Sequence, residues 1–81
     1  MAFKKLSDLH PGQSGMIKSL TLNGSPRQRI MAMGFVKGES VKVIRKAPLG
    51  DPIEFEVKNY KLSLRKSEAA LIEVEVLHDA A

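Results

Sequence analysis

Hydrophobic and polar residues alternate in short runs along much of the second half of the chain. These runs cover residues 41–43, 53–58, 61–64 and 72–76. Alternation with a period of two is typical of a strand that buries one face and exposes the other. A further apolar run over 17–22 changes phase near Lys18 and Ser19, as a β-bulge would cause. The pattern therefore predicts about five short antiparallel strands.

The segment between the first two predicted strands shows no alternation and carries helix signals instead. Ser25 and Gln28 have the spacing of a capping box, and Pro26 suits the first position of a helix. Gly34 stands where a helix commonly ends in a left-handed residue. We therefore predict a helix over 26–33. Because a helix of about eight residues does not persist alone in water, it should lie against the strands.

These elements predict a mostly β fold, with a short helix inserted between the first and second strands. The strands are expected to curl into a small closed or partly open barrel, because a barrel hides the edges of the sheet. A chain of 81 residues has room for one domain, so residues 1–81 are treated as a single unit. The longest apolar stretch, 30–36, is far shorter than the roughly 20 residues of a membrane span, and no direct membrane insertion is expected.

The chain offers little of the chemistry that catalysis or tight metal binding requires. It has no cysteine, which excludes a thiol nucleophile and a cysteine metal site and suits a reducing cytoplasm. His10 and His78 lie in no catalytic frame, and no phosphate-binding loop is present. We predict a non-enzymatic cytoplasmic protein without catalytic, cofactor-binding or metal-binding residues. Weak binding of ferrous or another divalent ion stays open, with Asp8 and His10 as a weak signal.

The formal net charge of +4 is unevenly spread along the chain. Residues 26–46 carry six basic side chains against Glu39 alone, whereas residues 51–79 carry four basic and seven acidic ones. The basic segment favours nucleic acid through phosphate contacts. However, the acidic last third would repel a phosphate backbone, and single-strand binding needs exposed aromatic side chains, which are scarce. Nucleic-acid binding is therefore the alternative and not the expected function.

Several residues around the predicted helix favour a surface that binds another protein. Arg27 and Arg29 fall in the first helical turn, where the helix macrodipole disfavours cations by about 0.3–1 kcal/mol each. A local rule broken without local gain often marks a functional surface. Met31 points away from the expected core face, Phe35 follows the terminating glycine, and Leu49 is apolar at a loop tip. These five residues are the candidate partner-binding site.

A series of short motifs extends from residue 6 to about residue 76. They are Leu6-Ser7-Asp8-Leu9, Pro11-Gly12, Ser25-Pro26, Met33-Gly34-Phe35, Gly38, Ala47-Pro48-Leu49-Gly50-Asp51-Pro52, Leu64-Arg65-Lys66 and Glu68-Ala69. In this order and spacing they resemble the ferrous iron transport protein A (FeoA) family. The resemblance covers a core of about 6–76, nearly the whole chain.

The resemblance implies an SH3-like small barrel, in agreement with the strand pattern. It also implies a cytoplasmic accessory that binds the GTP-binding region of the membrane permease ferrous iron transport protein B (FeoB) and supports or regulates iron uptake. A metal-responsive regulatory domain, related to the C-terminal domain of iron-dependent repressors, is a second alternative by analogy of fold. Exposed barrel edges permit a homo-oligomer without requiring one. The family often has an acidic residue at Ala32 and a proline at Lys37, and these departures affect which partner surface fits.

Overall fold

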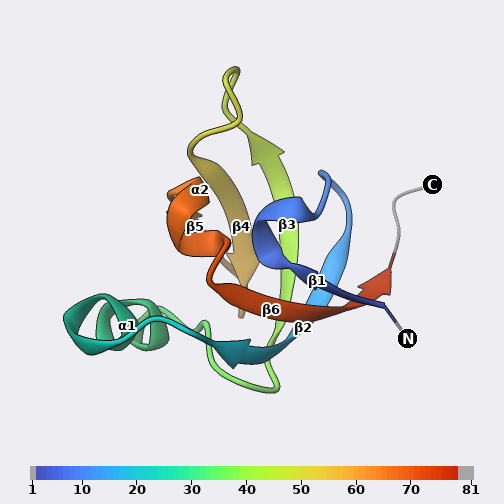
Figure 1. Ribbon diagram of the computed structural model, residues 1–81. Helices are drawn as coiled ribbons and strands as arrows, with labels where there is room; N and C mark the ends of the chain where they lie inside the picture. Colours follow the sequence, from blue (N-terminus) through green and yellow to red (C-terminus); the bar gives the residue numbers. More distant parts are fainter. Residues whose placement is uncertain (1, 79–81) are drawn as a thin grey trace.

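The computed structural model describes residues 2–78, and the side chain of His78 lies outside the described part. Strands are the predominant secondary structure, and a helix of nine residues lies between the second and third strands (Figure 1). The elements are β1 (Phe3–Lys5), the 3-10 turn η1 (Leu6–Asp8), β2 (Ser14–Leu20), α1 (Gly24–Ala32), β3 (Ser40–Lys46), β4 (Ile53–Val57), β5 (Tyr60–Leu64), α2 (Lys66–Ala69) and β6 (Ile72–His78).

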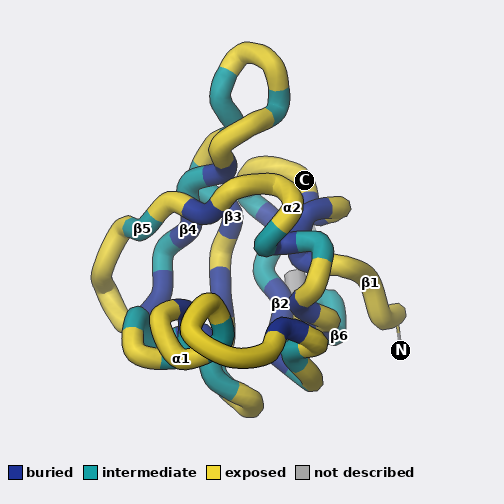
Figure 2. The backbone as a smooth tube through the Cα atoms, turned by 60° about the vertical axis from the view of Figure 1, so that its left-hand side comes forward, coloured by how far each residue is buried: buried dark blue, intermediate teal, exposed yellow. Residues whose placement is uncertain are grey.

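The six strands form one antiparallel sheet in the order β1-β6-β2-β3-β4-β5. The sheet curls around the core, so that the buried positions of its strands face one another (Figures 1 and 2). A register shift between Ile17 and Ser19 in β2 confirms the predicted bulge. A second shift, between Val43 and Arg45, bends β3 against β4.

The core is built from the inward positions of the strands and from a few residues outside them. The strand residues are Ile17, Val41, Val43, Ile53, Phe55, Val57, Leu64, Ile72 and Val74. Leu6 of η1, Ala69 of α2 and Ile30 of α1 also belong to the core, as do Leu9, Leu22 and Phe35 in the connecting segments. The alternating pattern therefore predicted the core residues of the strands correctly, because every second side chain of a half-buried strand points to its buried face.

The number of strands is six and not five, because β1 carries no hydrophobic alternation. Residues 3–5 pair with Glu73, Val74 and Glu75 of β6, yet all three are exposed. A short edge strand with no buried face leaves no signal of period two. A single helical turn, α2, also lies between β5 and β6.

α1 lies between β2 and β3 as predicted, but it begins two residues before the predicted start at 26. Asn23 is the N-cap, in an extended conformation and without a side-chain cap hydrogen bond. The capping box predicted for Ser25 and Gln28 is therefore wrong. No helix within residues 2–78 is both long enough and apolar enough to cross a membrane.

The end of α1 is as predicted and requires a glycine. Gly34 has a φ of 107°, its N–H donates to the Met31 carbonyl at 3.0 Å, and the Phe35 N–H donates to the Ile30 carbonyl at 3.3 Å. This pair of bonds is the Schellman arrangement that satisfies the last carbonyls of a helix. A Cβ at Gly34 would also approach Val57 Cγ1 to 3.2 Å, so space as well as backbone conformation favours glycine.

Candidate docking surface

α1 projects from one end of the sheet and turns most of its surface away from the core (Figures 1 and 2). All nine residues of α1 are described, and Ile30 is the one that is buried. On its outer side, Gln28, Arg29 and Ala32 are exposed and Met31 is half-buried. We call these four residues the α1 surface. Because residues three and four apart are neighbours on a helix, the α1 surface is one continuous patch.

The loop that holds Leu49 lies at the opposite end of the molecule from α1 (Figures 1 and 2). Leu49 is 96% exposed, as a residue at a loop tip should be. The reason for the separation is topological, because β3 carries the chain from the end of the barrel near α1 to the end that bears the loop. The candidate partner-binding residues therefore do not form one contiguous surface, which corrects the grouping made from sequence.

Arg27 has a structural role that the sequence did not reveal. Its Nη1 donates a hydrogen bond to the carbonyl oxygen of Leu20 at 2.8 Å and a longer one to that of Leu22 at 3.5 Å. These bonds attach the first turn of α1 to the end of β2. Charge-assisted bonds of this kind offset the unfavourable macrodipole at a helix N-terminus. The local gain that was missing from the sequence argument is therefore present.

Arg29 is also bonded within the chain, but it remains accessible. Its guanidinium forms an ion pair with one carboxylate oxygen of Glu68 in α2, while the other oxygen accepts the Arg65 N–H at 2.9 Å. The Arg65 N–H is the main cause that lowers the pKa of Glu68; partial burial opposes the lowering, and Arg29 adds to it. The Arg29 side chain connects α1 to α2. Because it is also 56% exposed, it belongs to the α1 surface as well.

Glu68 should make the stability of the fold sensitive to acid. Folding lowers its pKa, so its stabilising contribution is present at neutral pH and is lost as the pH falls through the folded-state pKa. The contribution is at most about 1 kcal/mol, because Arg29, the partner of Glu68 in the ion pair, is largely exposed to solvent. Glu68→Gln should therefore flatten the acid limb of the unfolding free energy, measured by urea denaturation between about pH 7 and pH 3.

Glu73→Gln is the matched control for this experiment, because Glu73 is an exposed carboxylate on β6. This variant should retain the acid dependence of the unmodified chain. An acid limb of unchanged slope in Glu68→Gln would show that the negative charge of Glu68 makes no contribution to stability.

Phe35 does not belong to an exposed surface, which corrects its assignment as a partner-binding residue. It has no exposed area and packs its ring edge to face against Phe55, with 5.9 Å between the ring centroids. The physical reason is the Schellman turn, which reverses the chain at Gly34 and directs the next side chain inward. Such turns commonly place an apolar residue against the last turn of the helix.

An open groove of about 720 Å³ beside β1 was not predicted. Its lining combines β1, η1, the end of β2 and the turn before β6, and includes Phe3, Lys5, Asp8, Thr21 and Leu71. Phe3 and Leu71 are 53% and 44% exposed. Recognition of residues 3–5 as a strand was the step that would have revealed the groove. Its side chains include apolar groups and charges of both signs, so they define no single ligand chemistry.

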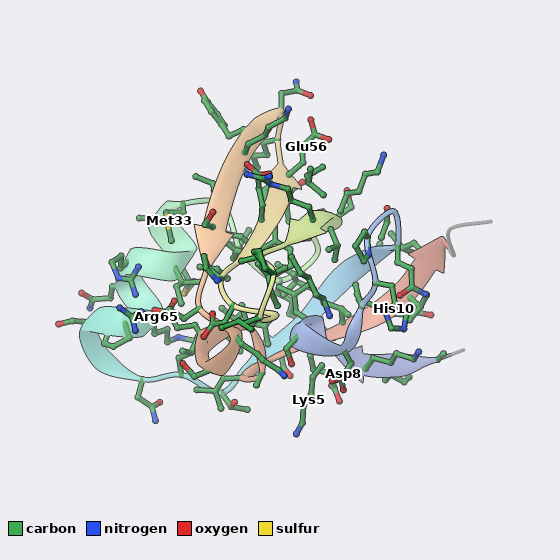
Figure 3. The ribbon with its side chains drawn as sticks, turned by 90° about the horizontal axis from the view of Figure 1, so that it is seen from above. Lys5, Asp8, His10, Met33, Glu56 and Arg65 are labelled. Atoms are coloured by element: carbon green, nitrogen blue, oxygen red, sulfur yellow. The ribbon has the colours of Figure 1, made fainter. Side chains whose placement is uncertain are left out.

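Asp8 and His10 are two residues apart in the sequence, and Figure 3, which labels both, shows them on the same side of the molecule. Both are exposed, and the His10 N–H donates to Gln13 Oε1 at 2.6 Å. Within the described part of the chain, no three acidic or histidine side chains gather into a group that could hold a metal ion. The side chain of His78 lies outside the described residues.

A comparison with models of protein families matches residues 4–76 to the FeoA domain. The chain belongs to the FeoA family. Among curated proteins, the Fe(2+) transport protein A/Fe(2+) transporter FeoB fusion protein of Porphyromonas gingivalis is 42% identical over 77 residues. That match covers 95% of this chain and 9% of the fusion protein, so the chain spans a small part of that relative.

Solved FeoA structures have the same fold. The solution structure of iron(II) transport protein A from Clostridium thermocellum matches with a TM-score of 0.87 and 48% identity, over 90% of this chain and 45% of that one. The Stenotrophomonas maltophilia FeoA complexed with zinc, described as an SH3 domain protein, matches with a TM-score of 0.72 and 34% identity, over 86% and 87% of the two chains. The SH3-like fold is therefore confirmed. FeoA proteins are non-enzymatic accessories with a role in Fe(2+) uptake.

Proposed function

We propose that this chain is a cytoplasmic accessory of ferrous iron uptake that binds the cytoplasmic GTP-binding region of FeoB through the α1 surface. The observation that carries the proposal is the Porphyromonas gingivalis relative, in which FeoA and FeoB are one polypeptide. Fusion holds two modules at a high effective concentration. Separate chains need a binding surface to achieve the same association, and the α1 surface is the candidate.

The composition and placement of the α1 surface support this role. Met31 is half-buried and Arg29 is exposed, at the two edges of the α1 surface, and methionine and arginine are enriched in protein interfaces relative to the rest of a protein surface. Ile30 is the residue of this helix that is buried in the core, so Gln28, Met31 and Ala32 on the outer side are not core residues. Ala32 adds no bulk there, which leaves Met31 accessible to a partner.

Replacing Ala32 with Lys should lower the affinity for the soluble cytoplasmic domain of FeoB by about tenfold or more, because a long cation would then stand in the centre of the interface. Met31→Ser should act in the same direction. The measurement is an amide NMR titration of the labelled 81-residue chain with that domain. Shifts should cluster on residues 24–33.

Ser63→Lys is the matched control, since it places the same side chain on an exposed strand position away from α1. It should bind like the unmodified chain. Equal affinity of the Ala32→Lys, Met31→Ser and control variants would remove the α1 surface from the proposal. Tight, salt-dependent binding of a mixed oligonucleotide pool, without binding to FeoB, would favour the nucleic-acid alternative instead.

A further inference from the structure

The loop between β3 and β4 is the most prominent projection of the barrel (Figures 1 and 2). Its outermost residues, 47–50, are Ala-Pro-Leu-Gly and carry no charge. Leu49 is 96% exposed, far more than the other large apolar side chains of the described residues. Because water solvates such a side chain poorly, its exposure at a projecting tip needs an explanation other than packing.

The backbone of this loop is suited to a poorly hydrated environment. Pro48 and Pro52 have no backbone N–H, so neither leaves an unpaired donor when water is removed. The Ala47 N–H donates to the Pro52 carbonyl at 3.0 Å, and the Gly50 N–H donates to the Ala47 carbonyl at 2.7 Å. Transfer of the tip out of bulk water therefore leaves few backbone donors without a partner, and unpaired donors are the main cost of such a transfer.

Basic side chains surround the base of the same loop. Arg45 and Lys46 precede it at the end of β3, where Lys46 Nζ donates to the Ser7 carbonyl at 3.2 Å, and Arg65 lines a hollow with Asp51 and Pro52. Lys66 follows Arg65, and its backbone N–H donates to Asp51 Oδ1 at 2.8 Å. The acidic side chains at this base are Asp51 and Glu54, and Glu54 is paired with Arg45 at 3.2 Å. Four basic and two acidic residues thus occur at the base of the loop, behind an uncharged tip.

We propose that this end of the molecule docks on an anionic lipid surface, with Leu49 in the headgroup region and the basic side chains of the loop base against the lipid headgroups. An exposed apolar residue that projects beyond a group of basic residues is typical of peripheral membrane contacts. A convex tip with a single large apolar side chain suits a deformable lipid interface, whereas a protein partner would need a matching pocket. The contact is peripheral and independent of the α1 surface, which lies at the opposite end.

The chain contains no tryptophan, so Leu49→Trp introduces a single fluorescent reporter at the tip. Its emission should move to shorter wavelength with vesicles of phosphatidylcholine containing about 30% phosphatidylserine, and stay unchanged with phosphatidylcholine alone. In sedimentation with the anionic vesicles, Leu49→Ser should lower the partition coefficient by roughly tenfold. The double variant Arg65→Gln, Lys66→Gln should lower it by a similar or greater factor.

Tyr60→Trp is the matched control. Tyr60 is 69% exposed at the start of β5, where it pairs with Val57 at the end of β4 that is distant from the loop. Its emission should not respond to either vesicle. An unchanged emission of the Leu49→Trp variant at low salt would overturn the proposal, as would an equal shift at position 60. Loss of FeoB binding in Leu49→Ser, with vesicle partition unchanged, would assign the loop to a protein partner. Failure of the α1 variants to affect FeoB binding would leave the lipid result untouched.

Discussion

Phe35→Ala should lower the free energy of unfolding by about 3–5 kcal/mol, which is among the largest effects expected of a single substitution in this chain. Phe35 has no exposed area and forms an edge-to-face contact with Phe55, so the substitution removes both apolar burial and an aromatic pair. A domain of 81 residues is only marginally stable, and the variant is expected to be partly unfolded at 37 °C. Urea denaturation followed by circular dichroism measures the loss.

Phe35→Leu keeps the test informative if the alanine variant does not fold. Leucine retains most of the buried volume, so the expected loss is about 1–2 kcal/mol, and affinity for FeoB should be unchanged. A Phe35→Leu variant with full stability and weakened FeoB binding would return Phe35 to the partner surface. The two measurements thus separate a core residue from a contact residue.

Gly15→Ala should lower the free energy of unfolding by about 2–3 kcal/mol through steric conflict. A Cβ at this position would lie 2.8 Å from Val74 Cγ2, 2.9 Å from Val74 Cβ and 3.3 Å from the Glu75 carbonyl oxygen. Gly15 is paired on both sides, with Val41 of β3 and Val76 of β6. Because β2 is held between two strands, the sheet cannot open to admit the methyl group without loss of pairing.

The shortest steric contacts of a Cβ at Gly15 are with the Val74 side chain, and a double-mutant cycle with Val74→Ala tests their contribution. Val74→Ala alone should destabilise by leaving a cavity in the core. In the double variant the contact of the new methyl group with Val74 Cγ2 is removed, whereas the contact with Cβ at 2.9 Å remains. The combined loss should therefore be smaller than the sum of the single losses, but the steric conflict is only partly relieved. A strictly additive pair would show that Val74 Cβ and the backbone of β6, and not Val74 Cγ2, oppose the methyl group.

Sequence patterns predicted those parts of the fold in which one residue decides the local structure. The alternation over 53–58 identified Phe55 as a core residue, and the change of phase near Lys18 located the bulge in β2. Gly34 marked the end of α1 for the same reason, since few other residues accept its backbone angles. β1 was missed because an exposed edge strand is defined by its partner strand and leaves no pattern of its own.

The candidate site was predicted less well, because it depends on contacts between distant segments. Arg27 suggested a functional surface only while its bond to the Leu20 carbonyl was unknown, and Arg29 only while Glu68, 39 residues away, was not placed beside it. Phe35 was assigned to the surface because a sequence does not show which way the chain turns after a helix. Leu49 was recognised as exposed, but its distance from α1 depends on the direction of β3.

The attachments of α1 determine what association with a partner would require of this helix. Arg27 fixes its first turn to β2, Ile30 anchors its middle in the core, and Arg29 connects it to α2. A helix held at three points has already lost most of its freedom to move before a partner arrives. The entropy lost on association is then small, so the free and bound forms should have nearly the same shape and the helix should dock as a rigid body.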